Sequence, residues 1–122
     1  MTSRTRSIDA FLPLTAPMLH TLVALADGEK HGYAILKEIA RRTEGSVRLS
    51  AGTLYAVIKR ATADGLIVES DERPDPALDD ERRRYYRLTP LGRRVAAAEI
   101  ARLESIVEMA RAKHLVRRRG LA

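Results

Sequence analysis

The chain has 122 residues, of which 45% are apolar, and this length and composition fit one domain around one hydrophobic core. It contains no cysteine, which excludes disulfides, thiolate metal sites and cysteine nucleophiles, and no apolar run approaches the roughly 18 residues of a membrane span. The net charge of +6 is uneven, because residues 71–81 hold six acidic residues and one arginine, whereas the remainder holds 21 basic and 10 acidic residues. The excess of positive charge outside residues 71–81 favours a polyanionic partner, although solubility alone explains the charge equally well.

The start of the chain predicts an arm followed by two helices. Residues 1–12 are mixed and polar at first, so we expect a flexible N-terminal arm. They lack the apolar stretch and small-residue cleavage site of a secretory signal, and we therefore expect a cytoplasmic protein with no membrane partner. Thr15 followed by Pro17 opens a first helix, which ends before Gly28. Apolar residues at helical spacing predict a second helix over residues 31–43.

A third helix and a hairpin are expected in the middle of the chain. Ser50 is the predicted N-cap of the third helix, because its hydroxyl can accept a free backbone N–H, and Gly65 is a suitable residue to follow its end. Residues 66–70 and 84–88 have the apolar and aromatic composition of short strands. The segment 71–83 between them has two prolines and many charges, so we expect a long hairpin loop.

A long helix closes the predicted fold. Thr89 and Pro90 are typical N-cap and first-turn residues, and the helix can continue to about Arg118, a length of roughly 40 Å. The element order predicts a mainly α fold with a β-hairpin wing, namely a winged helix-turn-helix with a long C-terminal dimerisation helix. The expected divisions are an N-terminal arm (1–12), a winged helix-turn-helix DNA-binding domain (13–88), the dimerisation helix (89–118) and a tail (119–122).

The third predicted helix has an unusual solvent face. An apolar stripe covers one side, and three very small residues with Lys59 cover the other, flanked by Arg60. Small side chains let a helix backbone approach a surface closely, and neighbouring cations then reach phosphates or a guanine edge. An ordinary solvated face is the alternative. We predict DNA contacts from Ser50, Gly52, Thr53, Tyr55, Ala56, Lys59 and Arg60.

The returning strand of the hairpin carries a cluster of arginines. Because side chains alternate along a strand, we expect Tyr86 and Leu88 to face the core. Tyr85 and Arg87 then face outward, where an arginine reaches backbone phosphate. The alternative is that the cluster neutralises the acidic residues that precede it. We predict DNA contacts from Arg82, Arg83, Arg84 and Arg87.

The last predicted helix has the seam of a coiled coil. Its apolar residues recur at alternating steps of four and three, and one such helix cannot bury this stripe on a small three-helix body. A second copy of the chain is the expected cover, with packing on the chain's own first helix as the alternative. We predict a dimer interface made by Ala96, Ile100, Leu103, Val107, Ala110 and His114.

The sequence gives little support to catalysis. His20, His31 and His114 lie far apart, none has the spacing of a metal-ligand pair on a helix, and no glycine-rich phosphate loop is present. His31 opens the second predicted helix, where an imidazole can act as a structural cap. We therefore expect no enzyme activity, no catalytic residue, no metal site and no cofactor.

Three segments, in the expected order and spacing, resemble the PadR family of transcriptional regulators. They are LADGEKHGYAILKEI (25–39), LSAGTLYAVIKRATADGLI (49–67) and RRRYYRLTPLGRR (82–94), and the single C-terminal helix is similar to the smaller subgroup of the family. The resemblance implies a winged-helix dimer that represses genes by binding near-palindromic operators. In many members a small, often aromatic or phenolic effector releases the DNA. The resemblance also implies that the His31-Gly32-Tyr33 motif packs and orients the second helix.

Together these patterns predict a homodimeric, sequence-specific repressor that binds double-stranded operator DNA, with half-sites about one helical turn (roughly 34 Å) apart. The sequence leaves open whether a small-molecule effector releases the DNA. One alternative is a winged-helix protein-interaction module whose basic face binds an acidic partner protein. Another is a ligand sensor with a secondary role in DNA binding, which a cavity between subunits, lined by Phe11 and the last helix, would favour.

Overall fold

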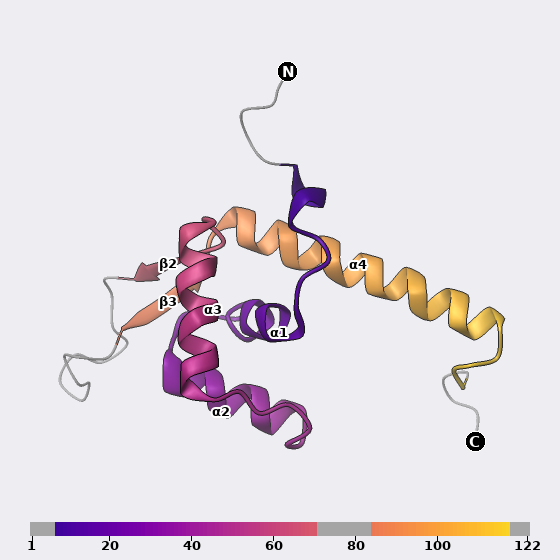
Figure 1. Cartoon of the computed structure of the whole chain (residues 1–122), viewed down its shortest axis with the longest axis horizontal. Coiled ribbons are helices and arrows are strands. Elements are labelled where there is room, and N and C mark those ends of the chain that lie inside the picture. Colours follow the sequence, from indigo (N-terminus) through magenta and orange to yellow (C-terminus); the bar gives the residue numbers. More distant parts are fainter. Residues whose placement is uncertain (1–6, 71–83, 118–122) are drawn as a thin grey trace.

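The computed structural model describes residues 7–70 and 84–117 of the chain (Figure 1). The predicted order of three helices, two strands and a long last helix is confirmed, and two short elements are added to it. The elements are η1 (Ile8–Phe11), α1 (Ala16–Ala24), β1 (Lys30–His31), α2 (Gly32–Arg42), α3 (Ala51–Ala63), β2 (Ile67–Ser70), β3 (Tyr85–Leu88) and α4 (Pro90–Ala112).

Each of the four α-helices begins at a side-chain cap that the sequence predicted. The side chains of Thr15, His31, Ser50 and Thr89 each accept a hydrogen bond from the backbone N–H three residues later, at 2.9–3.3 Å. At His31 the acceptor is Nδ1, so the imidazole has the structural role that we expected. These bonds satisfy amides that have no partner within the helix, and they fix where each helix starts.

The segment before α1 corrects the prediction of a flexible arm over residues 1–12. Residues 1–6 lie outside the described residues, whereas η1 is a 3₁₀ turn capped by Ser7. Its apolar side chains Ile8 and Phe11, with the following Leu12, pack against the core. The backbone N–H of Leu14 then donates to the Glu99 carboxylate on α4 at 3.1 Å. Burial of apolar groups and this bond order a segment whose composition alone suggested a loose chain.

Within residues 7–70 and 84–117 the sheet has three antiparallel strands in the order β1-β3-β2, so the wing has a strand that the sequence did not predict. The short strand β1 pairs His31 with Tyr85. The rings of these two residues pack edge-to-face, with their centroids 5.3 Å apart. Tyr85 is consequently buried, which corrects its predicted outward orientation. Tyr86 and Leu88 pack in or against the core and Arg87 is exposed, as predicted from strand alternation.

The start of α4 is locked onto the corner between α3 and β2. The backbone N–H of Thr89 donates to Leu66 O at 3.1 Å, and its hydroxyl donates to Gly65 O at 2.6 Å. At Gly92 the backbones are so close that an added Cβ would lie 1.9 Å from Leu66 O. Val95, one turn later, is fully buried in the core. The first turns of α4 are therefore part of the winged-helix body.

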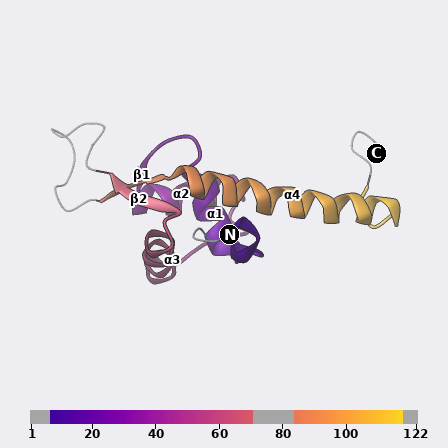
Figure 2. The ribbon, with the colours of Figure 1, turned by 90° about the horizontal axis from the view of Figure 1, so that it is seen from above.

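The second half of α4 extends beyond the other described elements (Figures 1 and 2). The helix ends at Ala112 and not near Arg118 as predicted, because His114 takes a left-handed conformation with φ of 64°. The N–H of Leu115 donates to Ala110 O at 2.9 Å, which closes the helix with a Schellman-type cap. His114 therefore lies beyond the helix and not on its predicted seam.

Candidate DNA-binding surface

Helix α3 presents one face to the core and the other to solvent. Leu54, Ile58 and Ala61 are buried. All seven of the predicted contact residues on this helix and its cap are exposed, and Tyr55 is the largest of them, with 69% of its surface accessible. The buried face fixes the rotation of α3, so the small side chains of the opposite face lie where the helix backbone can approach a partner closely.

The two cations of α3 differ in their surroundings. Arg60 Nε donates to the Asp64 carboxylate at 3.2 Å, one helical turn further along. Lys59 is exposed, and among residues 7–70 and 84–117 no carboxylate forms an ion pair with it. Exposed ion pairs contribute little to stability, so both cations can be redirected to a phosphate or a base edge at low cost.

The wing supplies two described arginines. Arg87 is exposed on β3, and Arg84 is exposed with its Nη1 3.4 Å from the Glu69 carboxylate on β2. The predicted contacts Arg82 and Arg83 lie outside the described residues. Among the described residues, the ion-pair partner of Arg84 is therefore Glu69 on the neighbouring strand.

Helix α2 adds two residues that the sequence analysis did not select. Tyr33 has 61% of its surface exposed, and the ammonium of Lys37 lies 5.3 Å from the centre of its ring. The first turn of α2 lies against the first turn of α3, since a Cβ at Gly32 would be 3.7 Å from the Leu54 side chain. The available signal was spacing: Tyr33 and Lys37 are four residues apart and lie off the apolar stripe of the helix.

The predicted dimer residues fall into three groups. Ala96 packs against the chain's own core, and His114 lies past the helix end. Ile100 and Val107 are exposed, while Leu103 and Ala110 are partly exposed. Further apolar residues on the same half of α4 are more exposed than these, namely Ile106 at 45% and Met109 at 56%.

An ion pair with a buried carboxylate lies at the point where α4 leaves the body. The side chain of Glu99 is only 2% exposed, and it accepts two hydrogen bonds from Arg102, at 2.7 and 3.0 Å, besides the one from Leu14. The Arg102 hydrogen bond holds the pKa of Glu99 below its usual range, against the effect of burial, which raises it. The pair joins the N-terminal segment to the middle of α4.

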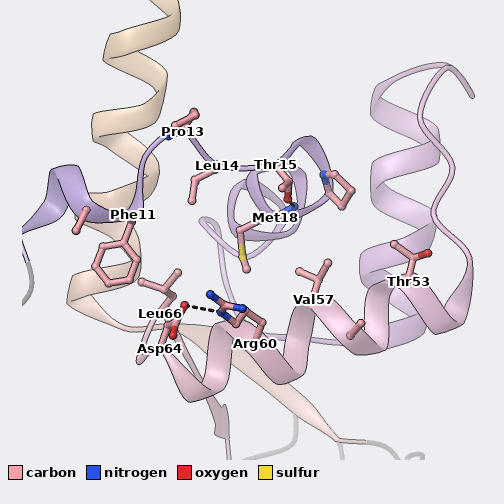
Figure 3. A pocket seen from close by; sticks show the side chains of 13 residues that line it. Phe11, Pro13, Leu14, Thr15, Met18, Thr53, Val57, Arg60, Asp64 and Leu66 are labelled. Atoms are coloured by element: carbon pink, nitrogen blue, oxygen red, sulfur yellow. Dashed lines mark hydrogen bonds and ion pairs between the residues drawn. The ribbon is translucent and has the colours of Figure 1, made fainter.

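A pocket of 680 Å³ lies beside α3 (Figure 3). Phe11 is among its lining residues, and residues of α1 and α3 and of the segments next to them form the other walls. Within the described ranges, no three histidine, aspartate or glutamate side chains gather as a metal site would require, and no helix has the length and apolarity to cross a bilayer.

Comparison with known proteins gives one consistent result. Residues 21–98 match the Transcriptional regulator PadR-like family. The chain is 40% identical over 91 residues to the transcriptional regulator Rv3488 of Mycobacterium tuberculosis, which covers 75% of this chain and 78% of that protein.

Solved structures with a similar fold include two that bear on the site. A transcriptional regulator from Clostridium thermocellum superposes with a TM-score of 0.67 at 25% identity, over 79% of this chain and 87% of that one. Bacillus subtilis PadR in complex with operator DNA superposes with a TM-score of 0.56 at 18% identity, over 90% of this chain and 52% of that one. The second likeness concerns the fold alone. With the family match and the M. tuberculosis relative, the winged-helix architecture shows that this chain belongs to the PadR-like family of transcriptional regulators.

Proposed function

We propose that this regulator is a sequence-specific repressor, active in the cytoplasm, that binds double-stranded DNA as a homodimer with α3 of each protomer in a major groove. The observation that carries the proposal is the exposed face of α3. Gly52, Ala56 and Ala63 have little or no side chain, so a partner can approach the helix backbone closely on this face. Lys59 and Arg60 lie beside these small residues. A bound operator in the structure of B. subtilis PadR supports the same use of the fold. A near-palindromic operator follows from two-fold symmetry.

The surrounding cations and hydroxyls would hold the duplex by its backbone. Tyr33 and Lys37 on α2 and Arg84 and Arg87 on the wing are all exposed, on elements that flank α3. Arg82 and Arg83 belong to the same proposed set. Contacts of this type fix register and orientation and make binding depend steeply on salt, whereas base contacts from α3 provide specificity.

The experiment compares two lysines of equal charge. Lys59→Ala should weaken binding to DNA from the protein's own upstream region by about 1–3 kcal/mol if Lys59 contacts a base. Lys113, which caps the far end of α4, is the matched control, since Lys113→Ala removes the same charge away from α3. Fluorescence anisotropy measures both affinities. Equal losses of DNA affinity in the two variants would mean that only net charge matters. They would contradict the proposed placement of α3 in the major groove.

The dimer rests on the second half of α4. Ile100, Ile106, Val107 and Met109 are exposed large apolar groups on a helix that extends beyond its own body. Contiguous apolar surface of this kind marks an interface, and a second copy related by two-fold symmetry covers it without leaving a free edge. The proposed interface comprises these four residues together with Leu103 and Ala110.

A charge placed in this interface tests the dimer. We expect light scattering at low micromolar concentration to give twice the chain mass of 13.6 kDa for the wild type, and the single mass for Ile106→Glu. Ala101 is exposed on the opposite side of α4, so Ala101→Glu should keep the dimer. A wild type of 13.6 kDa, or a monomer with both variants, would contradict the proposed interface.

A further inference from the structure

Helix α3 has a carboxylate directly after its end and none along its length. Residues 45–63 contain no acidic residue, and the next residue is Asp64, the C-cap of α3, which lies one helical turn beyond Arg60. A carboxylate beside a surface for DNA repels phosphates and lowers the affinity for every duplex. An ion pair with an exposed arginine also adds little stability. Discrimination between DNA sequences is the remaining property that this pair can improve.

Asp64 is a well-supported anchor for Arg60 (Figure 3). Arg60 Nε donates to Asp64 Oδ2 at 3.2 Å, and the arginine side chain is 72% exposed whereas the aspartate side chain is only 19% exposed. Asp64 lies on the wall of the pocket beside α3, together with Phe11 and Leu66. The surroundings of the carboxylate restrict its movement, while its partner faces solvent. The pair therefore limits the orientations of the guanidinium and leaves the outer edge of the group accessible.

The accessible edge of Arg60 has the donors that a guanine requires. A guanidinium has five N–H groups in a planar fork, and the bond to Asp64 engages one of them. The terminal nitrogens Nη1 and Nη2 carry the other four, and within residues 7–70 and 84–117 they have no hydrogen-bond partner. Two parallel N–H groups match the O6 and N7 acceptors of guanine in the major groove. A phosphate accepts from the same nitrogens in many orientations, so restricting the guanidinium favours guanine over the backbone.

We propose that Asp64 is a positioning residue, which holds Arg60 so that its Nη edge meets a guanine in each half-site of the operator. This inference rests on the proposed function and deepens it by assigning a base. Asp64 repels the phosphates of every duplex alike, whereas the restriction of Arg60 helps only a duplex with a guanine in register. A restricted arginine also loses less side-chain freedom when it binds. Asp64 therefore lowers the affinity for non-operator DNA more than the affinity for the operator.

A guanine analogue and two alanine variants test the proposal together. Fluorescence anisotropy measures binding to a duplex from the protein's own upstream region, to a scrambled duplex, and to copies of the upstream duplex in which guanines are replaced in turn by 7-deazaguanine, which lacks N7. For the wild type, replacement at one position of each half-site should lower the affinity by about tenfold. Arg60→Ala should abolish the effect at that position. Asp64→Ala should reduce it to about two- to threefold, and should raise the affinity for the scrambled duplex by about three- to tenfold.

Asp9→Ala is the matched control, because Asp9 is an exposed aspartate on η1, outside α3. It should leave the effect of 7-deazaguanine unchanged. That effect compares two duplexes on one variant, so a loss of stability in Asp64→Ala does not alter it.

Three results would overturn the inference and leave the proposed function intact. They are an analogue effect that survives Arg60→Ala at every guanine, an unchanged effect in Asp64→Ala, and an equal rise in affinity for scrambled DNA with Asp9→Ala. A wild type that binds the upstream and scrambled duplexes equally would overturn both the inference and the proposed function.

Discussion

Replacing Gly92 by alanine should destabilise the fold, because this glycine lets α4 dock on the corner between α3 and β2. The new Cβ would lie 1.9 Å from Leu66 O, 2.8 Å from its carbonyl carbon and 3.2 Å from its Cα. These are backbone atoms, so relief requires α4 to move outward by more than about 1 Å, and overpacking of this kind costs about 1–3 kcal/mol. The movement also stretches the hydrogen bond from the Thr89 hydroxyl to Gly65 O and the one from its backbone N–H to Leu66 O, each worth about 1 kcal/mol.

Alanine is a better helix former than glycine by about 1 kcal/mol, which offsets part of this loss. We therefore expect Gly92→Ala to lower the free energy of unfolding by about 2–4 kcal/mol, measured by urea denaturation with far-UV circular dichroism. Gly52→Ala is the matched control. That glycine is also helical, and its nearest atom is Ser50 Oγ at 4.0 Å, so stability should stay equal or rise slightly. A loss below about 1 kcal/mol at Gly92 would refute the close docking of α4.

Three further perturbations test other parts of the account. Because the pKa of Glu99 is held below its usual range, its contribution to stability should be present above the usual pKa and be lost as the pH falls through the folded value. Urea denaturation between neutral and acidic pH should therefore show a smaller pH dependence for Glu99→Gln, and an unchanged dependence would contradict the role of the ion pair. His31→Ala should lower thermal stability by about 1 kcal/mol through loss of the α2 cap, and His31→Asn should restore most of it; no difference between the two variants would exclude capping. Arg87→Gln should weaken binding to all DNA sequences alike and reduce the slope of log K against log salt by about one unit; a change in sequence preference alone would show that Arg87 does not contact phosphate.

Local signals made much of the fold predictable. The caps at Thr15, Ser50 and Thr89 depend on residues within one turn, and the buried stripe of α3 depends on helical period, so both follow from short stretches of sequence. The exposed face of α3 follows from the same period.

Features that depend on distant contacts were missed. Strand β1 has two residues and exists through its pairing with β3, which also buries Tyr85. The N-terminal segment is ordered by Glu99, 85 residues further along the chain. Helix α4 ends at Ala112 because a non-glycine residue beyond its cap, His114, takes the left-handed conformation, and this carries no strong sequence signal. The pocket combines segments from both η1 and α3, and no local pattern reports it.

Sequence-specific DNA binding is the central claim, and one titration tests it most directly. Fluorescence anisotropy should compare a duplex from the protein's own upstream region with a scrambled duplex of equal length, between about 50 and 300 mM salt. The account predicts sub-micromolar binding that falls steeply with salt and stays tighter than the scrambled control by about 10³ or more. Equal, weak binding to both duplexes would contradict it, and would leave the basic surface as a site for an acidic protein partner.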